Sequence, residues 1–207
     1  MRKFGWYPVI YMFIVTAFFS SIVIGFAQLT RERVEANKQL AFEKAALSVI
    51  PGLYDDQLGS LGIHEKFVAQ VNMPDKLSAT ACTIREDERI VAYIVPISGQ
   101  GFWAPIKGVV GLQADKKTIT GIAFYEQNET PGLGAEITKP QFRNQFKGKV
   151  LAVGRKLLNI KPAASELTQN DVHAVTGATQ TSIRLEQIIN TSLKNWLDEL
   201  AQGHKIE

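Results

Sequence analysis

The stretch Asp171-Val-His-Ala-Val-Thr-Gly-Ala-Thr-Gln-Thr-Ser182 decides how the rest of this 207-residue chain is interpreted. It begins as an extended run, turns tightly at Thr176-Gly-Ala-Thr179 and leads into a pattern typical of an amphipathic helix. The first amides of a helix have no intrahelical partners, and the helix dipole is positive at that end. The stretch therefore predicts an anion site surrounded by hydroxyl groups.

Apolar residues recur at helical spacing beyond this turn and predict a helix from about residue 181 to residue 202, ending at Gly203. They are Leu185, Ile188, Ile189, Leu193, Trp196, Leu197 and Leu200. Taken alone, Thr179, Thr181 or Ser182 is better interpreted as a plain N-cap of a core helix. The choice between an anion site and an N-cap depends on the rest of the chain.

A second unusual stretch is Glu126-Gln-Asn-Glu-Thr-Pro-Gly-Leu-Gly-Ala135. Pro131-Gly132 fits a type II turn, because proline fixes φ at its second position and glycine accepts positive φ at its third. The stretch also contains Gly134, but neither a Walker A loop nor a Rossmann fingerprint. Glu129 and Thr130 are predicted to make polar contacts to a heteroaromatic ring, with Leu133 against its face.

A third stretch, Ser98-Gly-Gln-Gly-Phe-Trp103, has two glycines followed by two aromatic residues. The aromatic pair could line a cofactor pocket. A hairpin turn followed by two core aromatics explains the same residues, and for this stretch alone we favour that interpretation.

The N-terminal segment carries no charge between Lys3 and Arg31 and exceeds the roughly 20 residues that a membrane-spanning helix needs. Trp6 and Tyr7 lie where an interfacial aromatic belt is expected. A cleaved signal peptide is the alternative, but its apolar region is normally about 7–15 residues long. We expect a retained anchor over residues 1–29, a juxtamembrane helix over 30–52 ended by Pro51-Gly52, and one domain over 53–207. Arg2 and Lys3 favour an inside start with the domain outside.

The domain is predicted to be α+β, with an antiparallel sheet and flanking helices. Two hairpins are predicted, one from residues 80–85 and 89–97 and one from residues 109–113 and 118–126. The sequence also predicts, in chain order, a short strand near 67–71, a short helix at 140–146, a strand at 150–153 and a polar loop over 161–170.

Composition excludes several classes of function. The net charge of +3 is spread out and no basic run interleaves with aromatics, which argues against nucleic-acid binding. Cys82 is the single cysteine and is predicted to be a buried strand residue. The histidines His64, His173 and His204 lack metal-ligand spacing, so no metal or haem site is predicted.

The three stretches, in this order behind one anchor, resemble the FMN-binding domain of membrane redox pumps. The chain looks like the C subunit of the sodium-translocating NADH:quinone oxidoreductase and, next, like the G subunit of the related Rnf complex. The resemblance implies FMN in a phosphoester to Thr179, within the motif of Thr176, Gly177 and Ala178. It also implies that a flavin transferase forms this bond.

The ring is then expected near Glu129, Thr130, Pro131, Gly132, Leu133 and Gly134, with Trp103 as a further neighbour. Where the family usually has an aspartate three residues before the motif, this chain has His173, and Asp171 stands two residues earlier.

The expected function is that of a membrane-anchored flavoprotein subunit that relays electrons and has no complete catalytic site of its own. Expected partners are the other membrane subunits of the redox pump, which would reduce ubiquinone, together with the flavin transferase and the lipid bilayer. The expected location is the bacterial inner membrane, with the domain on the periplasmic side. Two alternatives stay open: an Rnf G subunit, and a non-redox assembly or ligand-binding protein that keeps the fold, which His173 favours.

Overall fold

The computed structural model describes residues 5–154 and 156–203. The chain divides into two compact units, Met1–Gln39 and Leu40–Glu207, which are described separately. A single helix, α1 (Tyr7–Ser48), runs through both predicted N-terminal segments and ends just before Pro51-Gly52, as expected. The division into anchor, juxtamembrane helix and domain stays a prediction.

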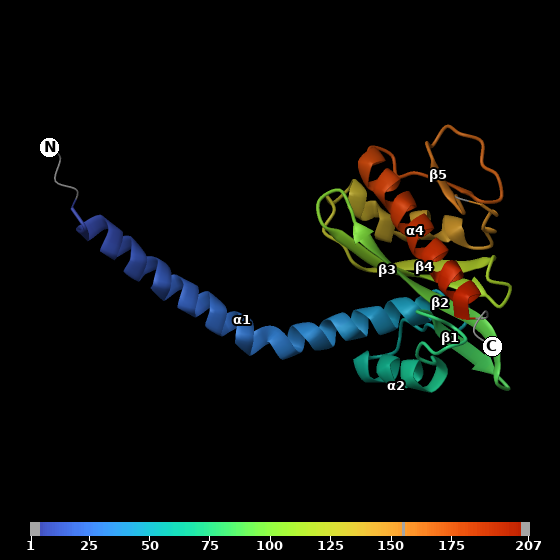
Figure 1. Ribbon diagram of the computed structural model, residues 1–207, viewed down its shortest axis with the longest axis horizontal. Coiled ribbons are helices and arrows are strands. Elements are labelled where there is room, and N and C mark those ends of the chain that lie inside the picture. Colours follow the sequence, from blue (N-terminus) through green and yellow to red (C-terminus); the bar gives the residue numbers. More distant parts are fainter. Residues whose placement is uncertain (1–4, 155, 204–207) are drawn as a thin grey trace. The chain divides into compact units, whose positions relative to one another are not determined.

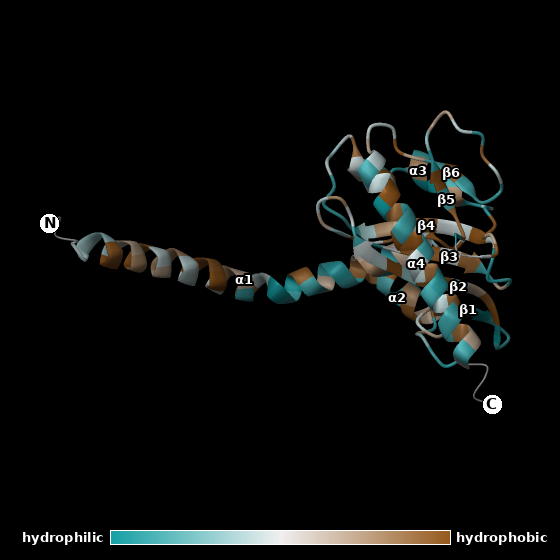
Figure 2. Ribbon diagram, turned by 45° about the horizontal axis from the view of Figure 1, so that its top comes forward, coloured by the Kyte–Doolittle hydropathy of each residue, from teal (hydrophilic) through white to brown (hydrophobic). Residues whose placement is uncertain are grey.

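The described residues of the N-terminal unit lie almost entirely in the first part of α1, and their apolar side chains are exposed. Figure 2 shows the hydrophobic residues along this part of the helix. By length and composition the helix is sufficient to cross a membrane. A signal sequence meets the same criteria.

The globular unit is built on an antiparallel sheet of four strands in the order β1-β2-β3-β4 (Figure 1). The strands are β1 (Cys82–Glu86), β2 (Arg89–Gln100), β3 (Pro105–Gln113) and β4 (Ile119–Glu126). The α+β class with flanking helices and both predicted hairpins are thereby confirmed. Cys82 is buried in β1, as predicted.

Helices cover both faces of the sheet, because alternate side chains of each strand point to opposite sides. Tyr93, Val95 and Ile97 of β2 pack with the apolar face of α4 (Thr179–Gly203). Ile94, the residue between the first two, packs on the other side with the last turns of α1 and with α2 (Ser60–Gln70). The predicted C-terminal helix is confirmed, although it begins at Thr179 rather than near residue 181.

The remaining elements connect the sheet to α4. They are η1 (Gly134–Thr138), α3 (Pro140–Arg143), η2 (Asn144–Phe146), and the parallel pair β5 (Asn159–Lys161) and β6 (Asp171–His173). The short helix predicted at 140–146 is present as α3 and η2.

Two predicted strands are wrong. Residues 67–70 are the last turn of α2, whose Ile63 and Phe67 stand four residues apart and are both buried. In the segment 150–153 only Val150 forms a bridge, with Thr118, because the sheet ends at β4 on that side. The predicted loop over 161–170 is present between the ends of β5 and β6.

Candidate functional site

The three unusual stretches of the sequence meet at one pocket of about 290 Å³. It opens between the turn that joins β2 to β3, the segment after β4 and the first turn of α4. Its lining residues are Phe102, Trp103, Thr130, Leu133, Gly134, Gly177, Ala178, Thr179, Gln180 and Thr181. Residues far apart in the sequence therefore share one site.

The turn at Pro131-Gly132 has the geometry that the sequence predicts. The Leu133 amide donates to the Thr130 carbonyl at 3.1 Å, and Gly132 has φ of +73°. Positive φ at the third residue of the turn is the reason for glycine there. The turn leaves Leu133 partly exposed, with its side chain beside the pocket.

The turn before α4 repeats this arrangement. The Ala178 amide donates to the Val175 carbonyl at 3.1 Å, and Gly177 has φ of +77°. A Cβ on Gly177 would lie 3.1 Å from Cδ2 of Leu133, so the two turns face each other at close range. Glycine at position 177 is thus favoured by its backbone conformation, and its lack of a side chain leaves room for Leu133.

Glu129 holds the three stretches together from behind the pocket. Its side chain is buried, with 5% of the residue exposed. One carboxylate oxygen accepts from the Trp103 amide at 3.1 Å, and the other accepts from the Thr181 hydroxyl at 2.7 Å. Glu129 thus links the β2–β3 turn to α4. Its predicted contact with a ring stays a prediction.

The aromatic pair after the glycines is not part of the core. Phe102 and Trp103 are 46% and 65% exposed, and both line the pocket. The hairpin is present, because the Gly101 amide donates to the Ala104 carbonyl at 2.9 Å. The expectation of core aromatics is wrong because β2 and β3 pair as far as Gln100 and Pro105, so that the pair lies in the exposed turn.

The hydroxyl groups at the start of α4 differ in their partners. Thr181 donates to Glu129, and the Ser182 hydroxyl accepts from the Val175 amide at 3.3 Å. Thr179 is exposed, and within the described residues its hydroxyl makes no hydrogen bond. The plain N-cap interpretation therefore explains none of the three, and Thr179 is left as the accessible hydroxyl at the pocket.

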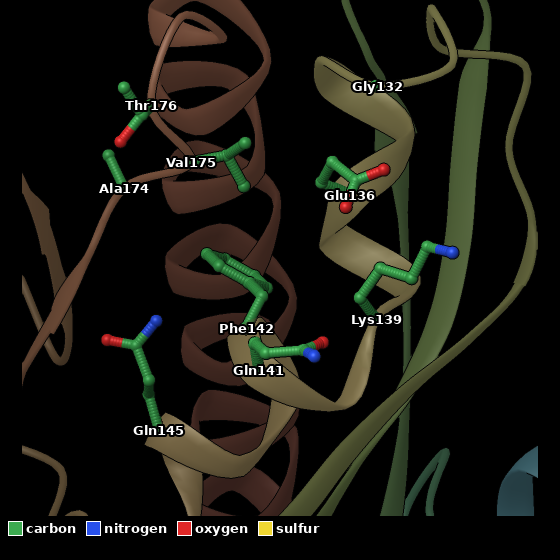
Figure 3. Close-up of a pocket in the computed structure, with 9 residues that line it drawn as sticks. All are labelled: Gly132, Glu136, Lys139, Gln141, Phe142, Gln145, Ala174, Val175 and Thr176. Atoms are coloured by element: carbon green, nitrogen blue, oxygen red, sulfur yellow. The ribbon is translucent and has the colours of Figure 1, made fainter.

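The other predicted site residues lie around this pocket. Thr176 and Gly132 line a neighbouring pocket of about 470 Å³, where Figure 3 shows the Val175 side chain directed toward Glu136 and the Thr176 side chain directed away from it. Pro131 is exposed in its turn. Sequence reasoning missed Gln180 and Thr181 as lining residues. Their position directly after Thr179, in the first turn of a helix, was the available signal.

The strand that leads to the turn is fixed by Asp171 and Gln145. Asp171 is buried and accepts from Lys161 at 2.7 Å and from Asn159 at 2.7 Å. Burial alone would raise the pKa of Asp171, but its hydrogen bonds with Lys161, Thr168 and Asn159 outweigh burial and hold that pKa well below its usual range. The His173 amide donates to the Gln145 side chain at 2.9 Å.

Comparison with known proteins adds to this geometry. Residues 101–194 match the family model described as FMN-binding domain, a range that contains Trp103, both facing turns and Thr179. The resemblance inferred from the sequence is confirmed, because curated relatives are named as the C subunit of the Na(+)-translocating NADH-quinone reductase.

Two such relatives show the extent of the similarity. The protein from Neisseria meningitidis serogroup A is 41% identical over 99 residues, which cover 47% of this chain and 38% of the relative. The protein from Pasteurella multocida is 35% identical over 117 residues, which cover 56% of this chain and 44% of the relative. The matched region thus spans less than half the length of these curated relatives.

Solved structures show the same fold. The C subunit of the Na(+)-translocating NADH-quinone reductase from Parabacteroides distasonis superposes with a TM-score of 0.66 at 24% identity, covering 82% of this chain and 94% of that chain. NqrC from Shewanella oneidensis superposes with a TM-score of 0.52 at 25% identity, covering 65% of this chain and 70% of that chain.

Proposed function

We propose that this chain is the FMN-carrying C subunit of a membrane Na+-translocating NADH:quinone oxidoreductase, with the flavin joined covalently to Thr179. The observation that carries the proposal is the exposed Thr179 hydroxyl at the N-terminus of α4, on the rim of a pocket inside the region that matches an FMN-binding domain. The name shared by the curated relatives supports the choice of complex.

The residues at the turn suit a phosphodiester on Thr179. Gly177 lets the backbone approach the phosphate, and Ala178 adds little bulk. The first-turn amides of α4 lie at the same end of the helix, where the helix dipole favours an anion by about 0.3–1 kcal/mol. That contribution is too small to retain a cofactor, so we propose that a covalent bond, made by a flavin transferase, prevents its loss.

The pocket walls suit a flat heteroaromatic ring. Leu133, Phe102 and Trp103 offer apolar surface, and Thr130 fixes the Trp103 indole by accepting its Nε1 hydrogen at 3.1 Å. FMN, when bound, supplies the electron-carrying group, while the protein positions it and sets its surroundings. Glu129 keeps the β2–β3 turn and α4 at a fixed separation around the ring.

The proposal makes the chain an electron relay within a larger complex. The described residues that line the pocket form no arrangement of acid, base and nucleophile, so we assign no complete catalytic site to this chain. NADH oxidation and quinone reduction would take place on other subunits. The apolar part of α1 would anchor the chain in the bacterial inner membrane, with the globular unit outside.

A non-redox protein with the same fold is the second candidate, and His173 is the residue that favours it. The side chain of His173 is partly buried, and its Nδ1 lies 3.4 Å from the Pro162 carbonyl. An Rnf G subunit is the third candidate. The genes that neighbour the gene for this chain would distinguish it from the C subunit of the NADH:quinone oxidoreductase.

The experiment is to produce the full chain together with its host's flavin transferase and to inspect a denaturing gel under ultraviolet light. We expect a fluorescent wild-type band that is lost in Thr179→Val. Thr191→Val is the matched control, because Thr191 is an exposed threonine of the same helix and its variant should stay fluorescent. A dark wild-type band contradicts the covalent flavin and favours the non-redox protein.

A further inference from the structure

A separate pocket of about 510 Å³ lies among the end of α1, the loop after it, β4 and α3, and it shares no residue with the pocket at Thr179. We call it the Lys44–Arg143 pocket. It is lined by Ala41, Lys44, Ala45, Ser48, Tyr54, Asp56, Ala123, Phe124, Tyr125, Pro140 and Arg143. All of these residues belong to the globular unit.

Arg143 brings a partly buried cation to this pocket. Its Nε donates to the Ile122 carbonyl at 3.0 Å, which fixes the guanidinium against the edge of the sheet. Within the described residues no carboxylate lies at ion-pair distance from it. Burial lowers the pKa of Arg143, and Tyr54 partly offsets that effect. A cation withdrawn from water without a counter-ion is unfavourable, and a bound anion would offset that cost.

Lys44, near the end of α1, supplies a second positive charge to the lining. Its Nζ lies 5.5 Å from the centre of the Tyr54 ring, and the interaction with Tyr54 raises the pKa of Lys44. Tyr54 thus interacts with both cations. Among the described lining residues Asp56 is the one acidic residue, against the two basic residues Lys44 and Arg143. The net charge of the lining residues is therefore positive.

Aromatic and apolar side chains form the rest of the walls. Tyr54, Phe124 and Tyr125 are each partly exposed at the pocket. Phe42 packs edge-on against Tyr125 with ring centres 5.5 Å apart, which fixes the orientation of the Tyr125 ring. A pocket of this kind buries a flat apolar body and directs its charged group to the cations.

We propose that the Lys44–Arg143 pocket binds a small organic anion, with a phosphate or carboxylate group between the two cations and a flat apolar body against the tyrosines. Arginine is suited to this role because its planar fork matches both anionic groups, and hydrogen bonds between charged partners are stronger than neutral ones. The proposal does not depend on the flavin at Thr179.

The test is to titrate the full-length protein in detergent with phenyl phosphate and to measure the heat of binding by calorimetry. We expect saturable binding to the wild type and an affinity about tenfold weaker in Lys44→Gln and in Arg143→Gln, since each removes one charge-assisted contact. Lys147→Gln removes the same charge from an exposed site outside the pocket and should bind like the wild type. Phenol has only the aromatic ring of the probe, and inorganic phosphate has only its anionic group. Each should bind more weakly than phenyl phosphate.

Lys44→Gln is the decisive variant, because Arg143 also links α3 to β4 and its loss can disturb the fold. The proposal is overturned if the wild type shows no saturable binding, or if Lys44→Gln binds as tightly as the wild type. Equal weakening in Lys147→Gln would show a general effect of charge and would also overturn it. If inorganic phosphate binds as tightly as phenyl phosphate, the role of the aromatic walls is wrong.

Discussion

At the scale of single residues, the site depends on a buried carboxylate that contacts a loop and a helix at once. Glu129 accepts one hydrogen bond from the Trp103 amide and one from the Thr181 hydroxyl. The space around it is already filled, because a Cβ on Gly101 or on Gly134 would come within 2.8 Å of Glu129 side-chain atoms. The two glycines therefore serve the packing of Glu129 rather than the mobility of the chain.

Glu129→Ala is expected to lower the free energy of unfolding by about 2–4 kcal/mol, because it leaves the Trp103 amide and the Thr181 hydroxyl without their partner. Urea denaturation of the full-length protein in detergent measures this. Thr181→Val should cost less in the Glu129→Ala background than in the wild type, since the shared hydrogen bond is already absent. Additive effects of the two changes would argue against the coupling.

Asp171 gives the stability a predictable dependence on pH. Its pKa is lowered in the folded state, so its contribution is present above the unfolded value of about 4 and is lost as the pH falls below it. Asp171→Asn should lower the free energy of unfolding by about 2–4 kcal/mol near pH 7, because it removes the buried partner of Lys161. The difference between wild type and variant should shrink toward about pH 3. A difference that is constant with pH would show that the carboxylate is not the cause.

The sequence was sufficient to predict the residues that need a particular backbone. Gly132 has the positive φ that its type II turn predicts, and Gly177 lies in a predicted tight turn, although its positive φ was not predicted. The sequence was insufficient to predict the role of Glu129. No local pattern shows whether a carboxylate lines a pocket or holds the surrounding segments in place. The partners of Glu129 lie 26 and 52 residues away along the chain.

At the scale of elements, α4 joins the candidate site to the core of the globular unit. Its first turn carries Thr179, and its later turns bury Leu193, Trp196 and Leu200 against the sheet. Trp196 also donates from Nε1 to the Ser78 carbonyl at 3.0 Å and packs edge-on with Tyr93. The position of the site residue therefore depends on packing at the far end of the helix.

Trp196→Ala is expected to lower the free energy of unfolding by about 3–5 kcal/mol, the usual cost of a large cavity in a core. Trp196→Phe keeps most of the apolar volume and should cost less, because it loses chiefly the hydrogen bond to Ser78. Urea denaturation midpoints compare the two variants. Equal losses for both would mean that the hydrogen bond, and not the buried volume, accounts for the stability.

The elements that the sequence predicted best are those with long periodic patterns. The strands of the main sheet are rich in β-branched residues, and α4 repeats its apolar residues through several turns. Helix α2 was mistaken for a strand near its end, because it buries little more than Ile63 and Phe67. The extended run predicted from Asp171 is present as β6, whereas its partner β5 was missed, because a strand of three residues is too short for an alternation to be visible.

At the scale of the whole molecule, the proposed function requires a membrane anchor and a globular unit in one chain. We expect the full chain to sediment with membranes and to remain there after washing with alkaline carbonate, because the first part of α1 is apolar enough to cross a bilayer. A chain beginning at Leu40 should appear in the soluble fraction. Release of the full chain by carbonate would contradict a spanning anchor.

The central claim is that one hydroxyl, on Thr179, carries the flavin. The most direct measurement is mass spectrometry of the full chain produced with its flavin transferase, followed by fragmentation of the peptide that contains Thr179. The account predicts an added mass of FMN less one water, located on Thr179 and absent from Thr179→Val. An unmodified peptide, or the same added mass on Thr176 or Thr181, would contradict it.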